Sequence, residues 1–206
     1  MDTKEEARLL ALYRFEDEYY EAGLALVAGI DEAGRGPLAG PVAAAAVILP
    51  PHALIERLND SKKLSAKRRE ELAAIIKETA LAWSIATVEA AEIDAINILQ
   101  ATKKAMWLAV QGLSLRPQQL LIDGRDTLPQ QEIAQRAIIG GDRLSANIAA
   151  AGILAKTHRD ALMLQYHEQY PQYGFDKHKG YGTEAHRAAI KQYGSSPIHR
   201  LTFQVK

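Results

Sequence analysis

Four carboxylates stand where the sequence passes from an apolar run into a turn: Asp31, Glu32, Asp123 and Asp142. If such acids converge on one edge of a sheet they repel one another, and a divalent cation relieves the repulsion because Mg²⁺ and Mn²⁺ prefer hard oxygen ligands. Two such ions can activate a water and hold the leaving oxygen in phosphodiester cleavage. For any one acid, a turn or helix-capping role is the stronger alternative. The four together favour a metal site.

The first two acids are adjacent, and adjacent residues of a regular strand face opposite sides. Asp31 and Glu32 can therefore share a site only where the strand breaks, and we expect Gly34 and Gly36 to provide that break. The spacing of the glycines also matches a dinucleotide-binding loop, but that loop requires a following helix, and the strand-like AAAAVIL follows instead. Bare backbone at glycine would let a polymer approach closely and form hydrogen bonds.

Charge is distributed unevenly along the chain, although 25 basic and 25 acidic residues cancel. Residues 1–30 hold seven acidic and three basic side chains, whereas 151–206 hold eight basic and four acidic ones, with five of the six His and five of the eight Tyr. Basic groups interleaved with Tyr and His suit a phosphate backbone and stacked bases. A merely solvated face is the alternative.

The apolar pattern predicts an α/β fold with a mixed sheet and helices on its faces. The expected strands are 24–30, 42–49, 83–88, 120–123 and 137–140, and the expected helices are 4–21, 61–80, 92–112, 145–170 and 184–193. The order mixes hairpin connections with helical crossovers, and the 206 residues fit one main domain.

Composition limits the cellular setting. The absence of Cys excludes disulfides, thiolate zinc sites and a thiol nucleophile. The chain has no run of 18 apolar residues, and its N-terminus, MDTKEEARLL, is charged where a signal peptide would be apolar. We expect a soluble cytoplasmic monomer with no membrane partner.

Five segments, in order, resemble the bacterial ribonuclease HII family, the type 2 ribonucleases H. They are GIDEAGRGPLAGPV (29–42), NDSKKLSAKRREEL (59–72), LLIDG (120–124), GGDRLSANIAAAGILAKTHRD (140–160) and YPQYGFDKHKGYGTEAHRAAIKQYGSSPIHRLTF (170–203). The most specific are GIDEAGRGP and HKGYGT, and the resemblance extends over about residues 24–203.

The resemblance implies a ribonuclease H-like catalytic domain, 1–170, with a small helical substrate-binding appendage, 171–206. It also implies an endonuclease that cuts the RNA strand of RNA–DNA hybrids and cuts 5′ of single ribonucleotides in duplex DNA. The products would be a 3′-hydroxyl and a 5′-phosphate, and the cofactor two Mn²⁺ or Mg²⁺ ions. The expected setting is ribonucleotide removal during replication and repair.

The family also implies roles for individual residues. Asp31, Glu32, Asp123 and Asp142 would be catalytic metal ligands. Gly34, Arg35 and Gly36 would recognise the ribose 2′-hydroxyl, and Tyr181 would pack on the neighbouring sugar, although a Tyr covering the core is the plainer alternative. The residues expected to contact phosphate are Lys62, Lys63, Lys156, Arg159 and Lys179.

The chain departs from the family pattern in one helix, where Gly152 replaces the usual Ser and Thr157-His158 replaces Val-Thr. Two other functions remain open on the residues alone. One is a structure-selective deoxyribonuclease on the same fold, which would not need a 2′-hydroxyl. The other is a binding module without catalysis, in which the acids are caps.

Overall fold

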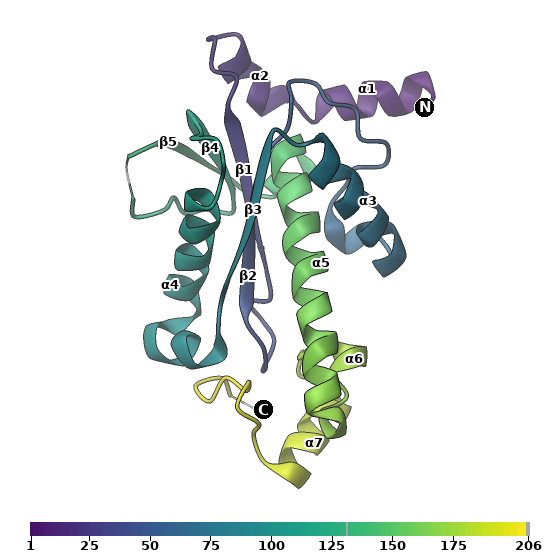
Figure 1. The fold of residues 1–206 in the computed structure, drawn as a ribbon, viewed down its shortest axis with the longest axis vertical. Coiled ribbons are helices and arrows are strands. Elements are labelled where there is room, and N and C mark those ends of the chain that lie inside the picture. Colours follow the sequence, from purple (N-terminus) through teal and green to yellow (C-terminus); the bar gives the residue numbers. More distant parts are fainter. Residues whose placement is uncertain (131, 205–206) are drawn as a thin grey trace.

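A mixed sheet forms the centre of the molecule (Figure 1). The computed structural model describes residues 1–130 and 132–204, and within them the sheet has five strands in the order β3-β2-β1-β4-β5. The strands are β1 (Val27–Ala33), β2 (Val42–Ile48), β3 (Ala82–Val88), β4 (Gln119–Asp123) and β5 (Ala134–Ile138). The β1–β2 and β2–β3 pairs are antiparallel, whereas β1–β4 and β4–β5 are parallel. The predicted α/β fold with a mixed sheet is confirmed.

Two long helices cover the two faces of the sheet. Figure 1 shows α4 (Ala90–Gln111) on one side of the strands and α5 (Ala146–Gln169) on the other. Every residue of β2, VAAAAVI, is buried between them. The small alanine side chains let both helices approach the strand closely, so the centre of the sheet is packed on both faces. The third large helix, α3 (Ala66–Thr79), packs against α5.

The N-terminal segment is two helices, not the single helix predicted over 4–21. Helix α1 (Thr3–Ala11) ends at Leu12, and α2 (Arg14–Tyr20) begins after Tyr13. The break is tertiary in origin, because the Tyr13 ring is buried and its hydroxyl donates to the Ala53 carbonyl over 2.8 Å. A buried carboxyl of α2, Glu16, then accepts from Ser145 Oγ at 2.6 Å and fixes the start of α5.

Other predicted boundaries also change. The helix expected over 61–80 is a 3₁₀ turn, η1 (Ser61–Lys63), followed by α3, because Ser65 accepts from the Arg68 amide and caps a new helix. Helix α4 is kinked at Asn97, which has a φ of 66°. Strand β1 continues to Ala33 instead of ending at residue 30, and β5 ends at Ile138.

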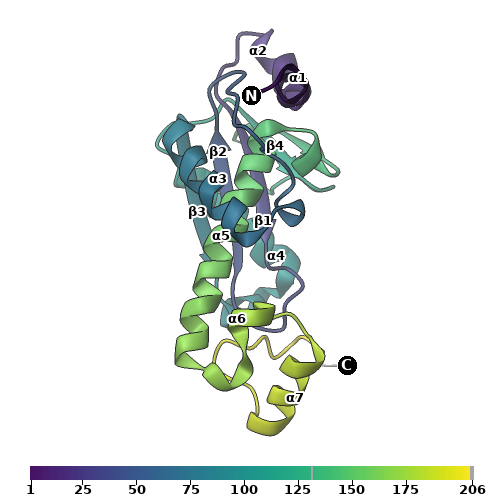
Figure 2. The same ribbon diagram turned by 90° about the vertical axis from the view of Figure 1, so that its right-hand side faces the viewer.

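The C-terminal segment lies at the far end of α5, opposite the N-terminal helices (Figure 2). The helix expected over 184–193 is confirmed as α7 (Glu184–Tyr193), preceded by the short η3 (Pro171–Tyr173) and α6 (Phe175–His178). These elements share a small core with Met163 of α5 and Ala39. In the part of the chain that is described, no helix has the length and apolarity needed to cross a membrane.

Close contact between β1 and α5 depends on Gly29. A Cβ atom there would lie 2.1 Å from the Asn147 carbonyl carbon and 2.2 Å from the Ile148 nitrogen, both of them backbone atoms that cannot rotate away. We therefore expect Gly29→Ala to lower the free energy of unfolding by at least ~2 kcal/mol through overpacking, measured by urea denaturation. Gly36→Ala is the matched control, because its Cβ would meet nothing closer than 3.8 Å. Equal stability of the two variants would contradict this account of the β1–α5 contact.

Candidate active site

The carboxylates are placed by the two central parallel strands. Asp31 and Glu32 lie near the C-terminal end of β1, and Asp123 ends the adjacent β4. All three line one pocket of about 200 Å³. Asp142 follows in the 3₁₀ turn η2 (Gly141–Arg143), which is tied to the site because the Gly141 amide donates to Asp123 Oδ1 at 2.7 Å. The structure thus gathers the predicted acids at one edge of the sheet.

The two adjacent acids reach this edge without the predicted strand break. Both lie within β1, in register with Ala45 and Ala44 of β2. Asp31 faces α5, where a Cβ at Gly152 would lie 2.3 Å from its Oδ2. Glu32 and Asp123 also line a second hollow beside α4. The glycine that departs from the family pattern therefore leaves space for the first carboxylate.

Burial and mutual repulsion dominate the electrostatics of the acids. The pKa of Asp31 is raised well above its ordinary value by burial and by the charges of Glu32 and Asp123. Burial also raises the pKa of Glu32 and of Asp142, with Asp123 adding to both. A nearby cation would therefore stabilise the charged form of these carboxyls.

Lys62 supplies part of the counter-charge. Its Nζ lies 3.6 Å from Asp142 Oδ2. Although burial opposes the charge, the pKa of Lys62 is raised by the surrounding carboxylates, chiefly Asp31 and Asp142. Arg35 Nη1 also lies 3.3 Å from Glu32 Oε1, and Arg143 Nε lies 3.8 Å from Asp142 Oδ1, so three cationic side chains partly offset the four acids.

The carboxylate oxygens suit a hard cation whose remaining ligands come from water and substrate. Within residues 1–130 and 132–204, no three Asp, Glu or His side chains form a group that could hold a metal ion by themselves. Mg²⁺ in phosphate-processing sites, however, is commonly held by one or two carboxylates together with waters and substrate phosphates. The oxygen ligands and their repulsion fit ions shared with a substrate in this way, each of which would be held by one or two of Asp31, Glu32, Asp123 and Asp142.

Two buried arginines fix the glycine loop beside the acids. Arg200 donates to the carbonyls of Gly34, Arg35 and Gly40 over 2.6–3.0 Å. Arg159 donates to the carbonyls of Ala39, Pro41 and Lys179 over 2.9–3.1 Å. The loop is thereby held to α5 and to the C-terminal segment.

These bonds correct one sequence prediction. Arg159 was expected to contact phosphate, but its side chain is fully buried and its guanidinium serves backbone carbonyls. Sequence reasoning also missed Arg200, because a basic residue that clamps backbone looks the same in the sequence as one that faces solvent.

The two glycines of the loop differ in whether the fold has room for a Cβ atom at their positions. Gly34 has a φ of +93°, and a Cβ there would lie 2.0 Å from Arg159 Nε, so this glycine is needed by the fold. Gly36 is exposed, and a Cβ there would meet only Tyr181 Cε1 at 3.8 Å. A Cβ at Gly36 would therefore fit without a clash, in van der Waals contact with the Tyr181 ring, and both residues line the acidic pocket.

Tyr181 and two of the predicted lysines line the acidic pocket. The tyrosine is 44% exposed, and Lys156 Nζ lies 5.9 Å from its ring centroid. Lys62 and Lys156 both line the pocket. Asp160, whose role the sequence did not indicate, accepts from Lys156 at 2.7 Å and from Arg69 of α3 at 3.1 Å.

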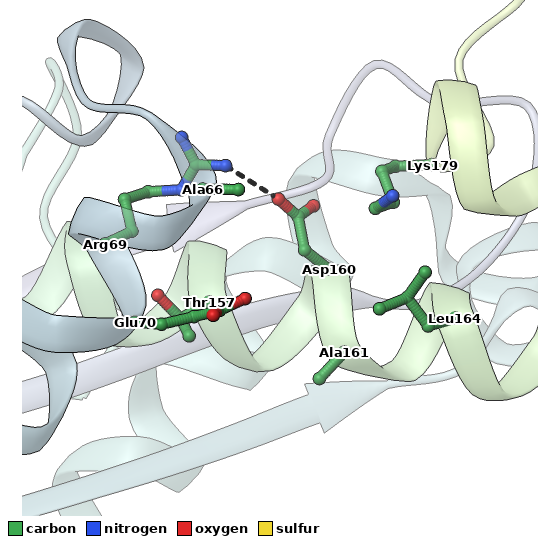
Figure 3. A pocket seen from close by; sticks show the side chains of 8 residues that line it. All are labelled: Ala66, Arg69, Glu70, Thr157, Asp160, Ala161, Leu164 and Lys179. Atoms are coloured by element: carbon green, nitrogen blue, oxygen red, sulfur yellow. Dashed lines mark hydrogen bonds and ion pairs between the residues drawn. The ribbon is translucent and has the colours of Figure 1, made fainter.

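The other two lysines lie outside this pocket lining. Lys63 is exposed. Lys179 lines a neighbouring hollow of about 280 Å³ between α3 and α5, where Figure 3 shows Arg69 bonded to Asp160. Its ammonium group donates to the Asp176 carbonyl. The structure therefore separates these two from the lysines that adjoin the acids.

Two solved structures share this architecture. Ribonuclease H2 from Pyrococcus horikoshii OT3 is 28% identical with a TM-score of 0.72, covering 87% of this chain and 94% of that one. Ribonuclease HII from Archaeoglobus fulgidus, solved in a complex with PCNA, is 25% identical with a TM-score of 0.72, covering 88% and 96%. The sheet, its flanking helices and the carboxylates at the ends of β1 and β4 define a nuclease of the ribonuclease H-like fold.

Sequence comparison narrows the class further. The sequence model of the Ribonuclease HII family matches residues 28–206. Ribonuclease HII of Endomicrobium trichonymphae is 56% identical over 192 residues, 93% of this chain and 91% of that protein. Ribonuclease HII of Moorella thermoacetica is 52% identical over 200 residues, 97% of each chain. The chain belongs to the ribonuclease HII family of metal-dependent endoribonucleases, which act on RNA–DNA hybrids.

Repulsion in the pocket has a measurable cost. A carboxyl with a raised pKa binds more protons folded than unfolded, so the free energy of unfolding falls as pH rises between its ordinary and its raised pKa. Asp31→Asn removes one charge and keeps the oxygen that accepts from the Glu32 amide. In EDTA at pH 8 it should raise Tm by a few degrees, as ~1 kcal/mol corresponds to about 2–4 °C at this size.

The gain should shrink at pH 5, where fewer of the carboxyls are charged in the folded protein. The exposed Glu168→Gln is the control and should change Tm little at either pH. A gain from Asp31→Asn that is the same at both pH values would show that charge repulsion is not its source.

Proposed function

We propose that this enzyme cuts duplex DNA on the 5′ side of single embedded ribonucleotides, in addition to cutting the RNA strand of hybrids. The observation that supports this most directly is that Gly36 and Tyr181 line the same pocket as Asp31, Glu32 and Asp123. A sugar placed in that pocket lies next to the acids. The products would be a 3′-hydroxyl and a 5′-phosphate.

The proposed cofactor is a pair of Mg²⁺ or Mn²⁺ ions. When bound, they would supply Lewis-acid stabilisation of the phosphate and activation of water. The residues that would hold them are Asp31, Glu32, Asp123 and Asp142. Lys62, already 3.6 Å from Asp142, keeps one end of the acidic cluster neutralised and is placed to bind a phosphate oxygen.

The glycine loop would detect the ribose 2′-hydroxyl. Arg200 already engages the carbonyls of Gly34 and Arg35, so the loop is fixed before the substrate arrives. A fixed backbone spends no conformational entropy on recognition, unlike a flexible side chain. Gly36 lacks the Cβ that would otherwise occupy the space facing Tyr181. The backbone can thus approach the sugar within hydrogen-bonding distance.

Tyr181 would mark the junction between RNA and DNA. Its ring flanks the same space and is open to solvent. Packed on the neighbouring deoxyribose, it would crowd a second 2′-hydroxyl and so favour a DNA sugar at that position. Lys62 and Lys156 would contact the phosphates of the cut strand, while Lys63 and Lys179 would contact the duplex further away.

The wider assignments rest on the same proposal. The segment 171–206 would act as the substrate-binding appendage of a catalytic domain over 1–170. Its position at the end of α5, next to the glycine loop, supports this division (Figure 2). The enzyme would act as a cytoplasmic monomer in the removal of ribonucleotides during replication and repair.

The proposal is tested with an end-labelled DNA duplex that carries one ribonucleotide. Cleavage on its 5′ side in Mn²⁺ or Mg²⁺, absent in EDTA and absent on an all-DNA duplex, is the expected result. Cleavage of the all-DNA duplex would favour a structure-selective deoxyribonuclease, and binding without cleavage in either metal would favour a module without catalysis. Asp123→Asn should abolish cutting while duplex binding persists.

The two loop glycines offer a paired comparison. Gly36→Ala should leave Tm unchanged but lower cutting at the single ribonucleotide at least about tenfold, because the added methyl group occupies the space for the sugar. Gly34→Ala should instead lower Tm, because it displaces Arg159 and strains a φ of +93°. Cutting rates and melting curves for both variants check this. Normal cutting by Gly36→Ala would place the sugar elsewhere.

A further inference from the structure

Three histidines lie together behind Tyr181. His186 of α7 is fully buried, His199 is 5% exposed, and the half-buried His178 stacks on His186 with ring centroids 4.4 Å apart. Phe175 packs edge-on against His178 and His186. None of these imidazoles lines the acidic pocket. Their arrangement is therefore not explained by the chemistry of the acids.

The hydrogen bonds of this cluster run in one direction. The Ser196 amide can only donate, and it lies 2.9 Å from His199 Nδ1, so the proton of His199 is on Nε2. That nitrogen lies 3.1 Å from His186 Nε2, which must accept, so the proton of His186 is on Nδ1. His186 Nδ1 then donates over 2.9 Å to the Tyr181 carbonyl, which can only accept. Backbone groups at both ends thus fix a single arrangement of protons.

The arrangement requires neutral rings. A second proton on either His186 or His199 would set two N–H groups against each other, or set one against the Ser196 amide. The pKa of His186 is lowered to about 4 by burial and by the neighbouring histidines, and burial also lowers the pKa of His199. Burial therefore favours the neutral form of both rings, which the hydrogen bonds require.

The turn that carries Tyr181 depends on such outside contacts. Lys179 and Gly180 both have positive φ values, of 50° and 85°, and the first of these is unfavourable for a residue other than glycine. Arg159 holds the Lys179 carbonyl at 3.0 Å, and the Leu38 amide holds the Gly180 carbonyl at 2.8 Å. The histidine chain joins the Thr183 amide, at 2.8 Å, in holding the next carbonyl, that of Tyr181 itself.

We propose that His186, oriented by His199 and Ser196, is a positioning residue that sets the Tyr181 ring against the sugar beside the scissile bond. This inference rests on the proposed role of Tyr181. The chain of neutral imidazoles fixes the tyrosine through its backbone and leaves the exposed ring free to meet the substrate. Loss of the chain loosens the turn without touching the acids, so it lowers junction recognition more than general hydrolysis.

Two substitutions of His186 separate positioning from packing. His186→Phe keeps a flat ring but has no donor, whereas His186→Asn carries an N–H close to the position of Nδ1. We expect His186→Phe to lower kcat/KM on the single-ribonucleotide duplex about tenfold and on a long RNA–DNA hybrid less than threefold. His186→Asn should recover most of this loss. The exposed His52→Phe is the control and should behave as wild type.

A double-mutant cycle with Tyr181→Ala distinguishes an error in the proposed role of Tyr181 from an error in the proposed role of His186. If Tyr181→Ala leaves both substrates unaffected, the proposed role of the tyrosine is wrong. If Tyr181→Ala lowers single-ribonucleotide cutting but His186→Phe does not, or if the two losses multiply independently, the positioning role of His186 is overturned. The expected result is that His186→Phe has almost no further effect in the Tyr181→Ala background.

A measurement on the wild-type enzyme covers the case in which His186→Phe fails to fold. Imidazole ¹⁵N shifts at pH 7 should show His186 protonated on Nδ1 and His199 on Nε2. A charged ring, or the opposite tautomer at either residue, would overturn the proposed chain.

Discussion

Two buried guanidinium groups fix the glycine loop relative to α5 and the C-terminal segment. Arg159 comes from α5 and Arg200 from the C-terminal segment, and together they bind six carbonyls, five of them in the loop 34–41. Burial lowers the pKa of both, that of Arg200 to about 9, with the charge of Arg159 as a further cause. Burying two cations is costly unless every donor is used. Here they are matched by carbonyls that the glycine loop, lacking regular structure, would otherwise leave unpaired.

In the acidic pocket, by contrast, the buried charges are negative. Parallel pairing of β1 with β4 brings carboxylates together, and burial makes their charges costly, so the folded chain stores unfavourable charge there. Lys62, Arg35 and Arg143 offset part of it, since Arg35 pairs with Glu32 and the other two with Asp142, whereas Lys156 is paired with Asp160 and Arg159 with backbone. Burial and the charges of Glu32 and Asp123 still raise the pKa of Asp31, so the pocket favours a further cation.

The sequence was sufficient for the elements and for the acids. Short apolar runs indicated the five strands, and apolar positions at helical spacing indicated the long helices, because these segments are buried in the core. The sequence was insufficient where a contact between distant residues determines a helix boundary or the role of a side chain. Tyr13 ends a helix by burying its ring, and Arg159 reads as a phosphate ligand until its burial is seen. Strand β1 does end just before Gly34, but the expectation that Asp31 and Glu32 need that break to share a site was wrong. Both lie within the strand, and hollows on both of its sides let side chains that face opposite ways line one site.

Gly152 illustrates how the site and the fold compete within one helix. Glycine inside a helix costs up to ~1 kcal/mol relative to alanine, so stability alone would favour a larger residue. Any Cβ at this position would meet Asp31 Oδ2 at 2.3 Å, and the carboxyl, buried against α5, could yield only by moving within the acidic pocket. A Ser at this position would therefore require a shifted Asp31 or a wider gap between β1 and α5. In this chain Gly152 lowers the stability of α5 but leaves room for the Asp31 carboxyl. The position of that acid, and not helix propensity, therefore accounts for the glycine.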